Sequence, residues 1–168
     1  METIDTHIEE FNTSESYFGH ILFGQCNLVV PYVSIEISHH FINPSRKPKF
    51  IDKAYYIFEG ALSLNIDFSI NNNGNVEDYQ LCEMKNDLTK FYIGGNSFYK
   101  KTHTEMSIVA QKRYVQFLDE TKIADERWIP ENYAHFKANM EDSIEFLSNS
   151  KIPSNIQNLI GKNFKTIW

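Results

Sequence analysis

The segment LSLNIDFSI at residues 62–70 constrains the fold most, because its apolar and polar side chains alternate without a break. Successive side chains of a β-strand point to opposite faces of the sheet, so strict alternation indicates a strand with one face in a core and the other in water. A period close to two extends from Tyr17 to about Leu118. Most of the chain up to residue 118 is therefore predicted to form a β-sheet.

Turn residues between these strands predict that the sheet is mostly antiparallel. The run INNNGNV at 70–76 contains an Asn-Gly step, which supplies the positive φ angles of a tight hairpin. We interpret YIGGNSF at 92–98 in the same way, with its turn at Gly94, Gly95 and Asn96. Short turns leave no room for crossover helices, and Pro31 inside a strand pattern predicts an edge or a bulge. Strands are predicted near 17–24, 27–38, 53–60, 62–70, 76–84, 89–93, 97–103 and 105–118.

After Asp119 the pattern becomes helical. Pro130 suits the first turn of a helix, where its missing N–H is no loss. Apolar side chains then follow at spacings of three, four, four and three residues, which is typical of a helix stripe that packs on a sheet. These side chains are Tyr133, Phe136, Met140, Ile144 and Leu147. A long amphipathic helix is predicted over 130–149.

A shorter helix is predicted over 154–161, from a capping box of Ser154 and Gln157 and a terminating Gly161. The apolar tail KNFKTIW that follows is expected to pack back on the domain. Together the patterns predict an α+β fold. A mostly antiparallel sheet, either a sandwich or a half-barrel meander, packs with the long helix and the shorter terminal helix. Without a repeat or a linker, residues 1–168 form a single domain, mainly β over 1–118.

The chain is acidic, and its carboxylates are concentrated in two segments. It has 22 acidic and 16 basic residues, for a net charge of −6. Residues 1–45 hold six carboxylates and no Lys or Arg, and residues 119–145 hold eight carboxylates against three basic side chains. Such fields repel phosphate backbones and attract basic surfaces, so we expect a basic protein partner and no nucleic acid. An acidic surface that only promotes solubility is the alternative. The basic run RKPK at 46–49 is interpreted as a solvated loop.

The cysteines and the N-terminal residues give evidence on the cellular compartment of the protein. Cys26 and Cys82 lack a metal-type spacing, and we expect them to be buried free thiols. Glu2 and Asp5 lie where a secretory signal would be positively charged, and no apolar stretch follows them. Apolar runs are far shorter than the ~20 residues that span a bilayer. We expect a cytoplasmic protein without a membrane segment.

His39 and His40 are adjacent, which is a poor spacing for a shared metal ion. On a strand their imidazoles point to opposite faces, and none of the six histidines are two or four residues apart. One of the pair joining His20 or His103 across the sheet stays open. The sequence also lacks G-x-S-x-G, P-loop and G-x-G-x-x-G motifs. We expect no enzyme, no cofactor and no metal, with a metal-dependent enzyme built on His39 or His40 as an alternative.

The cadence of KAYYIFEGALSLNIDFSINNNGN, with the small size and the acidic charge, resembles that of bacterial immunity proteins encoded beside polymorphic or contact-dependent growth inhibition toxins. The resemblance extends loosely from about residue 17 to 118 and includes no diagnostic motif. Members of that group bind a cognate toxin domain, commonly a cationic nuclease, and cover its active site. The resemblance implies a protein-binding module, and it transfers no individual residue.

The connection DETKIADERWI at 119–129 sets a tryptophan among carboxylates. Aromatic anchors and charge-assisted contacts are typical of protein interfaces, so this stretch is the predicted contact surface. The predicted contact residues are Glu9, Glu10, Asp119, Glu120, Asp125, Glu126 and Trp128. In the alternative interpretation Trp128 packs under the helix that follows it. A second hypothesis for the whole chain is a small-ligand-binding or enzymatic β-sandwich or barrel, with a cavity between sheet and helix.

Overall fold

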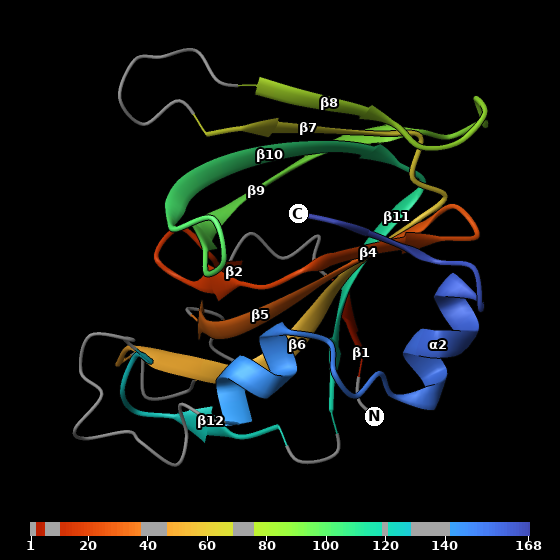
Figure 1. Ribbon diagram of the computed structural model, residues 1–168. Coiled ribbons are helices and arrows are strands. Elements are labelled where there is room, and N and C mark those ends of the chain that lie inside the picture. Colours follow the sequence, from red (N-terminus) through yellow and green to blue (C-terminus); the bar gives the residue numbers. More distant parts are fainter. Residues whose placement is uncertain (1–2, 6–10, 38–46, 69–75, 119–120, 129–141) are drawn as a thin grey trace.

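The computed structural model describes residues 3–5, 11–37, 47–68, 76–118, 121–128 and 142–168, and a curled sheet of 13 strands makes up most of these ranges (Figure 1). The strands are β1 (Thr3–Asp5), β2 (Phe11–Asn12), β3 (Tyr17–Phe18), β4 (Ile21–Gly24), β5 (Asn27–Ile37), β6 (Lys49–Glu59), β7 (Ser63–Asp67), β8 (Val76–Gln80), β9 (Thr89–Ser97), β10 (Thr102–Ala110), β11 (Lys112–Phe117), β12 (Ile123–Ala124) and β13 (Lys165–Ile167). A short helix covers 142–147, and α2 covers Ser154–Ile160.

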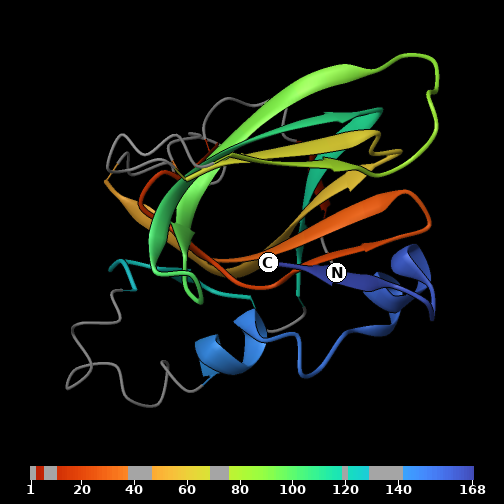
Figure 2. The ribbon, with the colours of Figure 1, turned by 45° about the horizontal axis from the view of Figure 1, so that its top comes forward.

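The main path of the sheet runs β1-β11-β6-β5-β3-β9-β10-β7-β8, and β3 with β9 is its parallel pair. The sheet curls so that β7 to β10 lie across from β4, β5 and β6 (Figures 1 and 2). This half-barrel confirms the predicted mostly antiparallel sheet. The fold as a whole is mostly β with short helices, rather than an α+β fold with a long helix.

Strand β5 is central, because β6 pairs with one of its edges while β2, β3 and β4 share the other. Pro31 lies in this strand at the junction between the β3 and β4 contacts. Its carbonyl accepts a bond from Gly19 N at 3.0 Å. The N and O of a strand residue point to the same neighbour, so the missing N–H faces this break in the ladder. Because β5 pairs on both sides here, the predicted edge is wrong. The alternative prediction, a bulge, fits the register, since residues 19–21 lie opposite only residues 30 and 31 between the β3 and β4 ladders.

The core fills the interior of the half-barrel. Large side chains from β3, β5, β6, β7 and β10 meet there and are almost fully buried: Phe18, Tyr32, Phe58, Leu64 and Ile108. The Tyr32 hydroxyl donates to Gly94 O at 2.8 Å. Burial raises the pKa of Tyr32 well above its usual value, because the phenolate would be stranded in an apolar interior.

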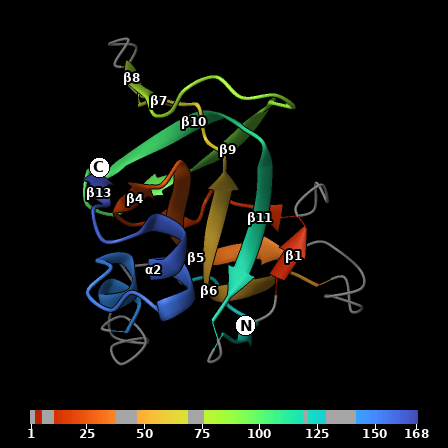
Figure 3. The same ribbon diagram turned by 90° about the vertical axis from the view of Figure 1, so that its right-hand side faces the viewer.

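A second apolar layer covers the opposite face of β4, β5 and β6. It is formed by side chains such as Val29 and Ile57 from the sheet, packed against Leu147 and Ile156 from the helices. The helices lie on the side of these strands that faces away from β7 to β10 (Figure 3). Because each helix buries one face on the sheet, together they hold the C-terminal part of the chain against it.

The long helix predicted over 130–149 is not found in the described residues. Residues 142–147 are helical, and a turn follows with Asn149 at a φ of 57°. Positive φ ends a helix, and Asn is one of the side chains that tolerate it. The rest of the predicted helix, 130–141, lies outside the described residues.

Helix α2 confirms the second predicted helix, with a different cap. Its N-cap is Pro153, without a side-chain cap, so the predicted box of Ser154 and Gln157 is wrong. The Gln157 side chain instead donates to Gly161 O at 2.5 Å. Gly161 ends the helix as predicted, with a φ of 73°. The tail also packs back as expected, because β13 pairs with β4.

The turn predicted within YIGGNSF lies later in the chain. Gly94, Gly95 and Asn96 are inside β9, and the chain reverses over 98–101. Gly95 has a φ of 152°, and a Cβ there would lie 3.1 Å from the Tyr32 ring. Glycine is therefore needed here because the strands of the curled sheet approach each other closely and leave little space for a Cβ atom.

Cys26 and Cys82 form a disulfide, so the prediction of free thiols is wrong. The bond joins the β4–β5 turn to the segment after β8, with the two Cα atoms 5.8 Å apart. Gln25 and Cys26 both have positive φ, at 51° and 61°, as a tight two-residue hairpin requires. Curling of the sheet brings the two cysteines together across 56 residues.

Candidate functional site

A pocket of about 610 Å³ lies where β5 and β6 both bend. The inward face of β5 passes from even-numbered residues, such as Tyr32, to odd-numbered ones, such as Ile35. The inward face of β6 changes likewise between Ala54 and Ile51. Ser34 and Asp52, which lie between, are absent from the strand register. We call this paired irregularity the kink, and the pocket beside it the kink pocket.

The kink is held by hydrogen bonds to the segment 121–128. Ser34 has a φ of 59°, which strains a residue with a side chain, and its Oγ accepts a bond from Trp128 N at 2.6 Å. The Asp52 carboxylate accepts bonds from the backbone N of Lys53 at 2.8 Å and of Lys122 at 2.7 Å. These bonds fix the segment along β6, where β12 pairs with Phe50 and Ile51.

The kink pocket has a buried floor and a charged rim. Ser34, Trp128 and Ser143 of the floor are buried, with Asp52, Lys53 and Ala124 half-buried beside them. The rim is exposed and comes from segment 121–128 and from the start of the 142–147 helix. Its residues are Lys122, Ile123, Asp125, Glu126 and Asp142. The pocket thus lies between sheet and helix, and carboxylates outnumber ammonium groups on its rim.

Trp128 is a structural part of the floor. Its ring lies edge-on to Tyr17 at 5.5 Å between centroids and at 6.1 Å from Phe98. The indole is only 7% exposed, and its Nε1 is buried without a hydrogen-bond partner. The indole belongs to the apolar cluster that side chains of the sheet form with those of the helices. It is therefore not available as an exposed anchor.

Part of the acidic charge near the pocket is compensated within the chain. Arg127 pairs with Glu15 at 3.3 Å and Glu36 at 3.2 Å, and its guanidinium stacks over a neighbouring phenylalanine ring. Lys49 pairs with Asp125 and donates a hydrogen bond to it, which lowers the pKa of that carboxyl below its ordinary value. Of the three carboxylates on the rim, Asp125 is thus paired within the chain, and Glu126 and Asp142 remain for a partner.

Glu126 and Asp142 are exposed, and neither has an ion pair with another described residue. The ammonium groups of Lys53 and Lys122 likewise have no ion pair within the described ranges. Among the described residues, the pocket therefore presents charges of both signs that lack an internal ion pair. Such a rim can form charge-assisted hydrogen bonds to an incoming surface.

The structure brings three of the predicted contact residues to one pocket, with Asp125 and Glu126 on its rim and Trp128 in its floor. The other four, Glu9, Glu10, Asp119 and Glu120, lie outside the described residues, as do His39 and His40. Sequence reasoning missed the pocket residues from β5, β6 and the helix. Among these residues, only Asp142 could have been suspected from the sequence, because it belongs to the acidic segment 119–145.

The described histidines have separate partners. His20 stacks on Tyr99 at 4.0 Å and its Nδ1 lies 2.9 Å from Trp168 O. His103 Nε2 lies 3.0 Å from the Glu105 carboxylate. The part of the chain that the structure describes contains no group of three or more His, Cys, Asp or Glu residues arranged to hold a metal ion. No helix within it is long and apolar enough to cross a bilayer.

Comparisons with protein-family models, with curated proteins and with solved structures found no match to this chain.

Proposed function

We propose that the chain is a protein-binding module that uses the rim of the kink pocket to bind a basic partner. One observation carries the proposal: Glu126 and Asp142 are exposed beside a concave surface, and neither forms an ion pair with another described residue. Basic side chains of a partner could pair with these two carboxylates. The proposal assigns the chain no reaction and no cofactor.

The finer proposal is an immunity protein that neutralises a nuclease-like toxin domain by covering its active site. It rests on the resemblance in size, charge and strand cadence, and on the acidic rim. Nucleases that bind phosphate backbones present basic clefts, and opposite charge speeds the encounter of two such surfaces.

The disulfide bears on the compartment. Cytosolic thiols are kept reduced, and persistent disulfides are typical of oxidising compartments. The cytoplasmic location stays a prediction, and the Cys26–Cys82 bond weighs against it. A chain that meets its partner outside the cytosol is equally compatible with the acidic rim.

The test screens the purified chain for binding to the proteins encoded next to its gene and measures that binding as a function of salt. We expect the association rate to fall steeply between about 50 and 500 mM salt, because screening weakens steering. The double variant Glu126→Gln/Asp142→Asn should lower the affinity about tenfold or more, as expected for two charged contacts.

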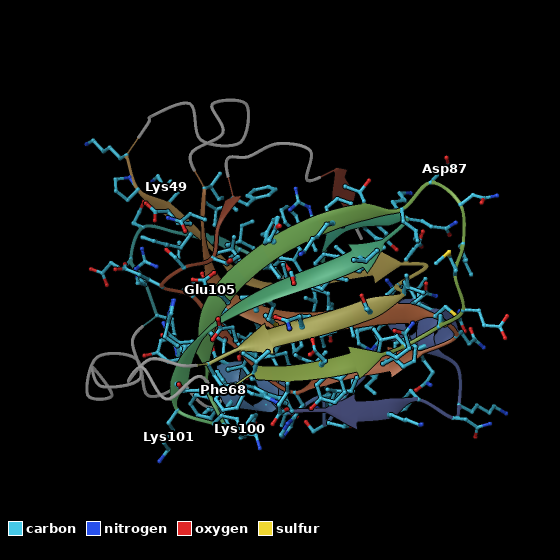
Figure 4. The ribbon with its side chains drawn as sticks, turned by 90° about the horizontal axis from the view of Figure 1, so that it is seen from above. Lys49, Phe68, Asp87, Lys100, Lys101 and Glu105 are labelled. Carbon is cyan, nitrogen blue, oxygen red and sulfur yellow. A yellow bond between two sulfur atoms is a disulfide. The ribbon has the colours of Figure 1, made fainter. Side chains whose placement is uncertain are left out.

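The matched control is Glu83→Gln/Asp87→Asn, which removes the same charge from exposed positions of the segment between β8 and β9. Asp87 lies at the opposite end of the molecule from Lys49, the partner of Asp125 (Figure 4). The control should bind like the original chain. Binding that is indifferent to salt, or an equal loss in both double variants, would contradict the proposal.

A second candidate function is the binding of a small ligand in the kink pocket. Its volume falls within the roughly 300–1,000 Å³ typical of ligand sites, and it lies between sheet and helix. This alternative differs from the first in that a ligand enclosed by the floor would bind with little dependence on salt.

A further inference from the structure

A second pocket, of about 370 Å³, lies beside the turn that joins β9 to β10. It is lined by Tyr17, Asn96, Ser97, Phe98, Lys101, Thr102 and His103. We call it the turn pocket. Tyr17 and Phe98 also contact Trp128, so these aromatic rings separate it from the kink pocket. None of the described residues that line it is a carboxylate, although the chain has a net charge of −6.

The polar side chains of the turn pocket include one ammonium group, from Lys101. Lys101 is exposed, and its ammonium has no ion pair with any described residue. The His103 ring lies between Asn96 and Glu105, with Nδ1 3.4 Å from Asn96 Oδ1 and Nε2 3.0 Å from Glu105 Oε1. The Thr102 hydroxyl donates to the His103 carbonyl at 3.4 Å.

The apolar part of the turn pocket comes from the rings of Tyr17 and Phe98, both half-buried. Aromatic faces next to one ammonium group suit a ligand with a flat apolar body and a single negative charge. A highly charged phosphate would need more cationic groups than this wall provides. The volume is large enough for a small ligand of this kind.

We propose that the turn pocket binds a small organic carboxylate with an aromatic body, with the carboxylate at Lys101 and the ring against Tyr17 and Phe98. This site lies outside the acidic rim, and the inference does not depend on the proposed protein partner. The chain would then carry two sites of opposite charge preference on either side of one aromatic partition.

Lys100 provides a matched control within the same turn. Its Nζ lies 5.7 Å from the centre of the Trp168 ring, and it is not part of the pocket lining. Both lysines are exposed at the end of β9 and β10 (Figure 4). Replacing either one removes the same charge, so only a specific contact can distinguish the two variants.

The experiment titrates the ¹⁵N-labelled full chain with benzoate and follows amide shifts of residues 96–103. We expect saturable shifts with a Kd on the order of 1 mM, reasonable for a fragment of this size. Benzamide has the same shape without the charge and should bind at least about tenfold more weakly.

Lys101→Met should weaken benzoate binding by about tenfold, which is a typical effect for one charge-assisted contact. Lys101→Arg and Lys100→Met should each stay within about twofold of the original chain.

Absence of saturable shifts with benzoate would overturn the proposal. Equal binding of benzamide would show that charge is not recognised, and an equal loss in Lys100→Met would show only a general charge effect. Both results would also overturn it. A thermal unfolding curve for Lys101→Met that matches the original chain ensures that a loss of binding reports the contact and not misfolding.

Discussion

At the scale of single residues, the kink combines backbone strain with buried polar groups. Ser34 has a left-handed φ in the middle of a strand, and its hydroxyl accepts the backbone N–H of Trp128. Both residues are buried, so neither group can turn to water instead. Such strain persists only where the surroundings hold it, and it commonly marks functional sites. Ser34 therefore links the kink to the floor of the candidate site.

Two substitutions of Ser34 distinguish the energetic contribution of its hydroxyl from the cost of its strained backbone. Ser34→Ala should lower the free energy of unfolding by about 1–3 kcal/mol, because the buried Trp128 N–H loses its acceptor. Ser34→Gly loses the same acceptor but relieves the positive φ, so it should be less destabilising than alanine by about 1 kcal/mol.

Urea unfolding of both variants measures the difference. Ser107→Ala on β10, where the side chain is half-exposed, is the control and should change stability by less than about 0.5 kcal/mol. If alanine and glycine at Ser34 are equally destabilising, the positive φ is not a source of strain.

At the scale of elements, side chains join one end of the main path of the sheet to the end of a branch. Strand β8 ends the main path, and β13 ends the branch through β4. The Glu77 carboxylate of β8 accepts bonds from the Tyr79 hydroxyl and from Trp168 Nε1, both at 2.5 Å. Phe68 packs edge-on against the Trp168 ring at 5.1 Å. We call this contact the clasp, because it bridges β8 and the end of β13 without backbone pairing.

The clasp predicts a specific dependence of stability on pH. Hydrogen bonds from Tyr79 and then from Trp168 lower the pKa of Glu77 below 4.5. A carboxyl whose pKa is depressed by folding stabilises the fold above its unfolded pKa, and this contribution is lost as pH falls through the folded pKa. Glu77→Gln should therefore unfold more easily at neutral pH and lose less stability on acidification than the original chain.

Urea unfolding at a series of pH values from about 7 to about 3 tests this prediction. Glu83→Gln, an exposed carboxylate beyond the clasp, serves as the control and should follow the original curve. If the free energy of unfolding of Glu77→Gln and of the original chain depends on pH in the same way, the pKa of Glu77 does not change on folding and the prediction is wrong.

At the scale of the whole molecule, the disulfide and the clasp close the same side of the half-barrel. The Cys26–Cys82 bond connects the β4–β5 turn to the segment after β8, and the clasp connects β13 to β8. The two layers of strands that enclose the core are thus tied together at the side where backbone pairing ends. A covalent link across 56 residues removes conformational freedom mainly from the unfolded chain.

Reduction should accordingly destabilise the whole fold. The chain-entropy estimate for a loop of this size is about 4 kcal/mol, and measured effects are commonly about 2–4 kcal/mol. Urea unfolding with and without a reductant should show this loss. The variant Cys26→Ser/Cys82→Ser is the control, since its stability should match the reduced chain and stay unchanged by reductant. A reductant effect in that variant, or none in the original chain, would contradict the role of the bond.

The sequence by itself determined the local structure. Alternating side chains predicted the strands, because a strand displays its two faces residue by residue, and Gly161 predicted the end of α2. The acidic stretch directed attention to Asp125, Glu126 and Trp128, which line one pocket. Only the tertiary structure decided which strands meet, and with them the disulfide, the place of Gly95 and the kink. Each depends on contacts between distant segments, and the curl of the sheet creates those contacts. The periodicity of a single segment therefore could not predict these features.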